Sequence, residues 1–248
     1  MRPTPILFPH DSSVWFKMPS RRHVRGRRPL HVHGTATRWR GRAGVVEGSP
    51  EPGRNMPSMS VDSVRSATGA NVALLRGINV GGKNKLPMKD LAAMFRDAGC
   101  DDVQTYIQSG NVLFRAEPAL AEDIPSLIST SILSRFGYRV PVVTRTAQEL
   151  QEIVQANPFA EAGAEAGKLL VLFLADLPDP AHVEALDPNR SPGDEFVVLG
   201  REVFLHCPNG VARSKLTNSY FDSSLSTTGT ARNWRTVRKL LELATAVG

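Results

Sequence analysis

A chain of 248 residues with 41% hydrophobic residues can bury a sizeable core, as one large or two small domains. Its formal charge of +6 comes from residues 1–69, which hold 12 Lys/Arg and 4 Asp/Glu, whereas residues 70–248 hold 18 and 20. The near-neutral part therefore gives no support to a broad nucleic-acid footprint, and no apolar run approaches the roughly 20 residues that span a bilayer.

The cysteine content points to a reducing compartment. Cys100 and Cys207 are the only cysteines, lie far apart in the sequence and lack CxxC spacing. Two isolated thiols cannot build a zinc site, and they favour a cytoplasmic protein. No motif requires a metal or another cofactor, and no partner membrane is expected.

Residues 1–69 form a basic leader rich in Arg, Pro, Gly and Ser, without a helical or strand period, and we expect it to be disordered. Arg21-Arg22 is not followed by an apolar region, so the leader is not predicted to be an export signal. A nucleic-acid-binding arm and a transit peptide stay open, although the many Pro and Gly residues disfavour the latter. A further interpretation is that translation starts at Met56 or Met59 and that the upstream part is a gene-model artefact.

The first folded unit, residues 70–146, is predicted to begin near Asn71. Its periodicities predict, in order, strand 72–75, loop 77–86, helix 87–98, strand 103–108, strand 111–115, helix 122–136 and strand 140–144. Ser109-Gly110 is expected as a two-residue hairpin turn, and Pro141 marks the last strand as a sheet edge. This β-α-β-β-α-β order predicts a ferredoxin-like subdomain.

The second unit, residues 147–248, is predicted to be a smaller mixed α+β subdomain. Its expected elements are helix 147–155, strand 168–175, helix 181–186, strands 195–199 and 202–206 around Gly200-Arg201, a polar stretch 208–230 and helix 232–246. The sequence of Asn157-Pro158-Phe159 is taken as a simple helix end, and Thr230 as the N-cap of the last helix. The fold class is therefore α+β with two subdomains.

Polar side chains of the first unit are expected to meet at one end of its sheet. In a β-α-β-β-α-β unit the first two strands run the same way and the third lies antiparallel between them, so the loop, the hairpin turn and the start of the last strand come together. The side chains predicted to converge are Arg76, Asn79, Lys83, Gln108, Ser109, Asn111 and Arg139. Backbone N–H groups around Gly77, Gly81 and Gly82 could form an anion-binding nest there.

We therefore predict a site for a small anionic or phosphorylated ligand near the Gly77–Leu86 loop. The alternative is that the Gly and Asn residues only shape tight turns, while Arg76 pairs with a local carboxylate. A second cationic cluster, Lys215 with Arg232 and Asn233, adjoins the predicted helix start, where free N–H groups attract anions; an ordinary capped helix is the alternative. The case for a site is stronger if both clusters face one cleft.

The loop also imitates a P-loop. Residues 77–83 match GxxxxGK directly after a strand, but Asn84 replaces the Ser/Thr that would hold magnesium. Pro87 moves the helix start away from the Lys, so the helix N-terminus cannot face the phosphates. Nucleoside-triphosphate hydrolysis is therefore not predicted.

Four motifs carry a family resemblance: RGINVGGKNKLPM, TYIQSGNVLF, SKL and TARNWRTVRKLLEL. With them the sequence resembles the bacterial family catalogued as domain of unknown function 1697, over about residues 70–246. The resemblance implies a compact cytoplasmic α+β protein of two subdomains, the first ferredoxin-like, without an assigned activity or catalytic residue. Thr228-Gly229-Thr230 departs mildly from the family pattern, and the leader has no counterpart in it.

Two classes of function remain, beside a third option in which the chain acts through contacts with other proteins. The first is a binding protein for a phosphorylated or other anionic ligand, with nucleic acid a less favoured partner of residues 70–248. The second is an enzyme, a transferase or hydrolase in which Lys83, Arg76 or Lys215 stabilises developing anionic charge. Because no proton-transfer group is evident beside these cations, binding ranks first.

Overall fold

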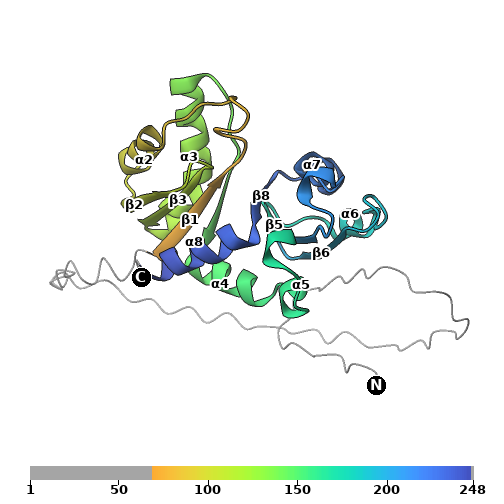
Figure 1. Ribbon diagram of the computed structural model, residues 1–248. Coiled ribbons are helices and arrows are strands. Elements are labelled where there is room, and N and C mark those ends of the chain that lie inside the picture. Colours follow the sequence, from red (N-terminus) through yellow and green to blue (C-terminus); the bar gives the residue numbers. More distant parts are fainter. Residues whose placement is uncertain (1–68, 247–248) are drawn as a thin grey trace, which may run out of the picture.

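The computed structural model describes residues 69–246, which form two antiparallel four-stranded sheets and seven α-helices (Figure 1). The fold is a mixed α+β fold, as predicted. The disorder predicted for the leader and the suggested starts at Met56 and Met59 lie outside the described residues. Of the helices within residues 69–246, none has the length and apolarity that crossing a membrane demands.

The first sheet has the strand order β2-β3-β1-β4. Its strands are β1 (Gly69–Leu75), β2 (Asp101–Tyr106), β3 (Asn111–Ala116) and β4 (Val142–Thr146). Helices α2 (Met88–Asp97) and α3 (Pro118–Phe136) cover one face, where Ala73 and Leu75 join their core. Strand β4 is an edge strand, as Pro141 predicted, although Pro141 itself lies just before it.

The second sheet repeats the first, with the order β6-β7-β5-β8. Its strands are β5 (Leu169–Leu174), β6 (Glu195–Leu199), β7 (Glu202–His206) and β8 (Gly229–Asn233). The helices α6 (Pro180–Glu184) and α7 (Asn218–Leu225) occupy the places of α2 and α3 in the element order. The repeat is therefore fuller than the loose one expected from the sequence.

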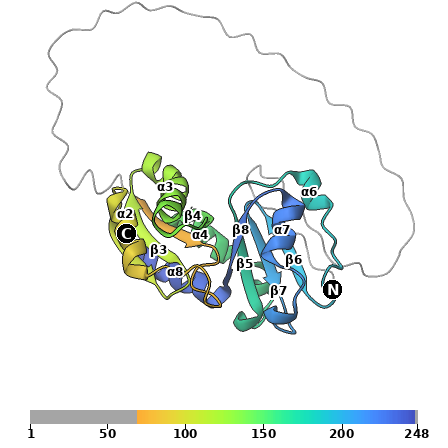
Figure 2. The same cartoon turned by 90° about the horizontal axis from the view of Figure 1, so that it is seen from above.

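The two sheets share a core that contains α4 (Ala147–Gln155) and α8 (Trp234–Ala246). Val72 and Leu74 of β1 reach it from the first sheet, and Val171 and Phe173 of β5 reach it from the second. Figures 1 and 2 show α8 running from β8 back beneath the first sheet. The last helix thus packs across the subdomain boundary that the sequence places after residue 146. Short helical segments complete the chain: α5 (Pro158–Glu161) and the 3₁₀ turns Ala166–Lys168 and Val211–Arg213.

Several local predictions need correction. The β2–β3 connection is a four-residue turn, Ile107–Gly110, because Tyr106 pairs directly with Asn111. The polar stretch 208–230 contains α7 and the start of β8. Thr230 lies within β8, and the cap of α8 is Asn233, whose Oδ1 accepts the N–H of Thr236 at 2.8 Å. The short helix α5 begins where a plain helix end was expected, with Asn157 as its cap.

Candidate functional site

The Gly77–Leu86 loop and the Ile107–Gly110 turn meet at one end of the first sheet, which we call the rim. Asn79 joins them: its Nδ2 donates to the carbonyls of Leu86 at 2.8 Å and Gln108 at 3.0 Å. Its Oδ1 accepts the Leu86 N–H at 2.8 Å. The segments that the sequence predicted to converge therefore do converge, and Asn79 is the connection between them.

The glycines of the loop form the tip of a small hairpin. Val80 pairs with Lys83, whose N–H donates to the Val80 carbonyl at 3.1 Å. Gly81 and Gly82 between them have φ values of 59° and 76°, as a tight I′-type turn requires. Both glycines and Lys83 are exposed, so the tip projects into solvent with its cation uncovered.

Arg232 connects the second sheet to the rim. Its Nε donates to Asn111 Oδ1 at 2.6 Å, and one terminal nitrogen reaches the carbonyls of Leu75, Ser109 and Gly110 at 2.7, 3.2 and 3.1 Å. The other terminal nitrogen bonds two acceptors within β8. Burial lowers the pKa of Arg232 to about 10. The two predicted clusters thus meet at Arg232, but its donors are all used inside the protein.

Arg76 also reaches across to the second half. It forms an ion pair with Asp222 of α7 and donates to the Gly229 carbonyl at 3.1 Å. Asp222 in turn accepts the Gly229 N–H at 2.9 Å. The partner of Arg76 is therefore a carboxylate 146 residues away, and the Arg76 side chain keeps 22% of its surface exposed.

Lys215 and Asn233 lie elsewhere. Asn233 pairs with Leu170 and Gly229 with Leu174, so Asn233 is at the opposite end of β5 from the residue that Arg76 contacts. Lys215 is exposed, and its N–H donates to Ser191 Oγ at 3.0 Å in the loop before β6. Of the predicted second cluster, only Arg232 reaches the rim.

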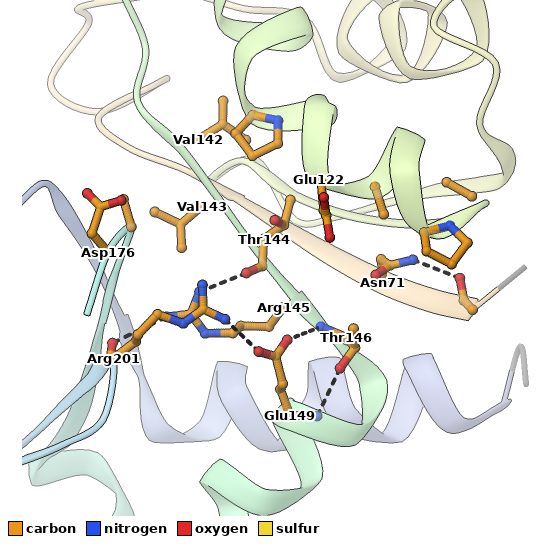
Figure 3. A pocket seen from close by; sticks show the side chains of 16 residues that line it. Asn71, Glu122, Val142, Val143, Thr144, Arg145, Thr146, Glu149, Asp176 and Arg201 are labelled. Atoms are coloured by element: carbon orange, nitrogen blue, oxygen red, sulfur yellow. Dashed lines mark hydrogen bonds and ion pairs between the residues drawn. The ribbon is translucent and has the colours of Figure 1, made fainter. Parts of the chain in front are cut away.

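A cleft that the sequence did not reveal opens along β4, between the two halves, with a volume of about 600 Å³ (Figure 3). Its walls come from β1, the start of α3, the whole of β4, the residues after β5 and the β6–β7 turn. The polar side chains among them are Asn71, Glu122, Thr144, Arg145, Thr146, Glu149, Asp176 and Arg201.

Paired charges, of which Arg145 is the buried one, form the floor of this cleft. Arg145, with a side chain 1% exposed, donates to Glu202 Oε1 at 2.8 Å, and to the carbonyls of Thr144 at 2.7 Å and Leu174 at 2.8 Å. Arg201 pairs with Glu149 at 2.5 Å. Burial raises the pKa of Glu202 despite the attraction of Arg145. The Arg145–Glu202 pair joins the first sheet to the second, and the Arg201–Glu149 pair joins the β6–β7 turn to α4.

One local signal of this arrangement was available in the sequence. Thr146-Ala147-Gln148-Glu149 has capping-box spacing, and both reciprocal bonds are present: the Glu149 N–H donates to Thr146 Oγ1 at 3.0 Å, and the Thr146 N–H donates to Glu149 Oε2 at 2.8 Å. The box fixes Glu149 at the cleft floor. No local sequence pattern predicts that Arg145 is buried, because Glu202 and Leu174, to which it donates hydrogen bonds, lie tens of residues later in the chain.

Neither cysteine is placed for nucleophilic catalysis. Both side chains are buried, and burial, with a smaller contribution from Asp101, raises the pKa of Cys100 to about 11. Burial also raises the pKa of Cys207. A thiolate at neutral pH is disfavoured at both positions.

The fold and the site define a mixed α+β protein of two joined antiparallel sheets with a polar rim and an inter-sheet cleft. The chain belongs to the family described as protein of unknown function (DUF1697), whose model matches residues 69–204. The match ends within β7, so β8 and α8 lie beyond it. No curated protein matched the chain.

A solved structure of similar fold is that of a conserved bacterial protein from Streptococcus pneumoniae. It is 20% identical to this chain, the alignment covers 72% of this chain and 99% of that one, and the TM-score is 0.58. The likeness supports the overall fold.

Proposed function

We propose that this protein is a binding protein that holds an anionic, phosphorylated ligand on the rim. The observation that carries the proposal is a group of exposed cations around the loop: Lys83, Lys85 and Arg139. Among residues 69–246, none of these three makes an ion pair with a carboxylate. Their uncompensated positive charge favours an anion.

The three cations come from segments that touch. Tyr138, next to Arg139, donates its hydroxyl to the Lys85 carbonyl at 2.5 Å. The Pro141 carbonyl accepts the Arg76 N–H at 3.0 Å, which holds the same segment against the start of the loop. Lys83 lies in the loop itself. A ligand on the rim therefore meets positive charge from both segments.

The remaining predicted residues support this surface. The side chains of Asn79, Asn111 and Arg232 form hydrogen bonds to the loop and the turn. We therefore assign these three residues a structural role in the rim. We assign ligand contact to Lys83, Arg139 and the exposed Gln108, with Gly81 and Gly82 allowing close approach. Arg76 and Ser109 are partly exposed neighbours that complete the polar surface.

Energetics favour a ligand with several negative oxygens. One exposed ion pair contributes about 0–1 kcal/mol, so a single carboxylate would bind weakly on this open surface. A phosphate or polyphosphate can engage two or three cations at once. The proposed ligand is therefore a phosphorylated compound, and a simple organic acid is a poor one.

The test compares pyrophosphate binding to the full chain and to a Lys83→Ala/Arg139→Ala variant. Hydrogen exchange should slow in residues 77–86 and 107–110 of the parent protein and change little in the variant. Arg238→Ala, which removes an exposed cation of α8, is the matched control and should behave like the parent. Equal protection in all three proteins, or protection outside the rim, would refute the proposal. Stronger binding of single-stranded DNA than of pyrophosphate, with a steep salt dependence, would favour the nucleic-acid alternative.

We further propose that each half is a ferredoxin-like unit, with the boundary near residues 146 and 147. The antiparallel strand orders β2-β3-β1-β4 and β6-β7-β5-β8 support this, since each half follows a β-α-β-β-α-β element order. Helix α8 then acts as a connecting element packed on both units.

A further inference from the structure

Strand β4 presents an unpaired backbone edge to the inter-sheet cleft. In an antiparallel ladder every second residue of a strand directs its backbone N–H and C=O toward the partner strand. The bond from the Arg76 N–H to the Pro141 carbonyl shows which residues of β4 do so toward β1. Val143 and Arg145, opposite Leu74 and Val72, then direct their backbone groups toward β1. The backbone groups of the alternate residues, Val142 and Thr144, point away from β1.

Only part of this outer edge is occupied. The Thr144 carbonyl accepts from Arg145, and the Thr146 N–H donates to Glu149. Within residues 69–246, no hydrogen bond takes the Val142 carbonyl or the Thr144 N–H. These two groups form an adjacent acceptor and donor, the pair that one residue of an added strand would satisfy.

The cleft provides space beside that edge. Val142 and Thr144 line it, and its volume of about 600 Å³ falls in the range of ligand sites. On one wall, Pro125 lacks the N–H that would normally reach the Ala121 carbonyl in α3, and both residues line the cleft. The Ala121 carbonyl in this wall therefore lacks its usual helical donor.

The charges of the cleft leave an acidic opening. Arg145 and Arg201 are each paired with a glutamate, so the floor is balanced. Glu122 and Asp176 are exposed and make no ion pair among the described residues; Asp176 accepts only the Thr227 hydroxyl, at 3.0 Å. Figure 3 shows these two carboxylates on either side of the Val143–Thr144 segment.

We propose that the cleft binds a short extended peptide segment of a partner protein, which pairs with Val142 and Thr144 and places a Lys or Arg side chain beside Glu122 or Asp176. Strand addition supplies backbone affinity, and the carboxylates select a basic segment. The Arg145 guanidinium, which bridges the Thr144 and Leu174 carbonyls, closes the edge beyond Thr144. The paired segment is therefore only a few residues long.

The probe is the peptide acetyl-Val-Lys-Val-Lys-Val-amide, added to the ¹⁵N-labelled full chain. We expect a shift and slowed exchange of the Thr144 amide. The corresponding peptide with Glu in place of Lys should bind at least about tenfold more weakly, and so should a backbone N-methylated peptide, which loses its donors. Absence of any change at Thr144, or equal binding of all three peptides, would overturn the proposal. Equal binding of lysine amide alone would also overturn it, because the site would then recognise an amine.

Two variants separate backbone from charge recognition. Thr144→Pro removes the outward N–H but leaves the inward bonds to β1, and an edge strand tolerates proline. It should keep a cooperative thermal transition and lose at least about tenfold in affinity. Glu122→Gln/Asp176→Asn preserves the backbone and should weaken only the Lys peptide. Unchanged binding of the Lys peptide by both variants would overturn the proposal. A dimer of the free chain that Thr144→Pro abolishes would also overturn it, because the occupant of the cleft would then be a second copy of this chain.

Discussion

Arg232 donates a 2.6 Å hydrogen bond to Asn111 Oδ1 across 121 residues of sequence. Asn111 is itself fully buried and links Arg232 to the β2–β3 turn. Its Nδ2 donates to the Tyr106 carbonyl at 3.1 Å and to Ser109 Oγ at 3.0 Å. One guanidinium from the second sheet thus sets the turn of the first. The rim depends on the association of the two halves.

Loss of Arg232 should therefore cost more than an ordinary surface change. Arg232→Met leaves the Leu75 carbonyl and the Asn111 Oδ1 without their buried donor, and we expect a loss of about 3 kcal/mol in the free energy of unfolding. Arg232→Lys should lose less, since one ammonium keeps some of the bonds. Urea unfolding measures both; Arg238→Ala, on the exposed face of α8, should stay within about 0.5 kcal/mol of the parent. A stable Arg232→Met protein would contradict this account of the rim.

Two glycines of the rim should respond very differently to alanine. At Gly110, φ is 72° and an added Cβ would lie 2.7 Å from the Leu75 Cβ and 2.9 Å from the Ile78 Cδ1. At Gly81, φ is 59° and nothing lies within 4 Å. Gly81→Ala should cost about 1 kcal/mol from backbone strain alone. Gly110→Ala adds overpacking of the core and should cost about 3 kcal/mol or more. Equal losses of stability in the two variants, measured by thermal unfolding, would show that the close packing at Gly110 adds nothing to the cost of the substitution.

The sequence predicted correctly those elements whose bounds depend on neighbouring residues. Strands β6 and β7 and helix α4 have the expected bounds, because apolar strand runs, a Gly-containing turn and a well-formed cap determine them. Strand β8, with the sequence GTARN, was missed because its burial depends on Arg232 finding acceptors in the other half. The convergence of the rim followed from strand order alone.

The cleft could not be predicted in the same way. Glu122, Arg145, Asp176 and Arg201 belong to four separate segments, and each looks like an ordinary charged residue in its own surroundings. They become neighbours only when α4 and α8 pack between the sheets. A sequence pattern can place residues at the end of one sheet, but the distance between two sheets depends on the shared core.

Both cysteines should resist alkylation in the folded protein. Burial holds the pKa of Cys100 at about 11 and raises that of Cys207, so little thiolate forms at mildly alkaline pH. Iodoacetamide followed by mass spectrometry should find both thiols unmodified in the native chain and modified in concentrated guanidinium chloride. Ser126→Cys, at an exposed position of α3, provides a reactive reference. Native labelling of Cys100 as fast as that reference would indicate local opening of the α2–β2 connection.

Acidification should loosen the cleft floor through Glu149. Burial alone would raise the pKa of this carboxyl, but the Thr146 N–H and the guanidiniums of Arg201 and Arg145 outweigh it and lower the pKa below 4.5. A carboxyl with a lowered folded-state pKa stabilises the protein above its unfolded-state pKa, and this stabilisation disappears as the pH falls through the folded-state value.

Glu149→Gln should therefore flatten the acid side of the plot of melting temperature against pH. The amide oxygen of Gln can still accept the Thr146 N–H, so the cap of α4 survives, while the titrating charge and its ion pair with Arg201 are lost. Arg201→Gln should produce a similar but smaller flattening, because the N–H of Thr146 and Arg145 still lower the Glu149 pKa. If the melting curves of parent and Glu149→Gln run parallel from neutral pH down to below the unfolded-state pKa, then Glu149 does not carry the acid sensitivity of this junction.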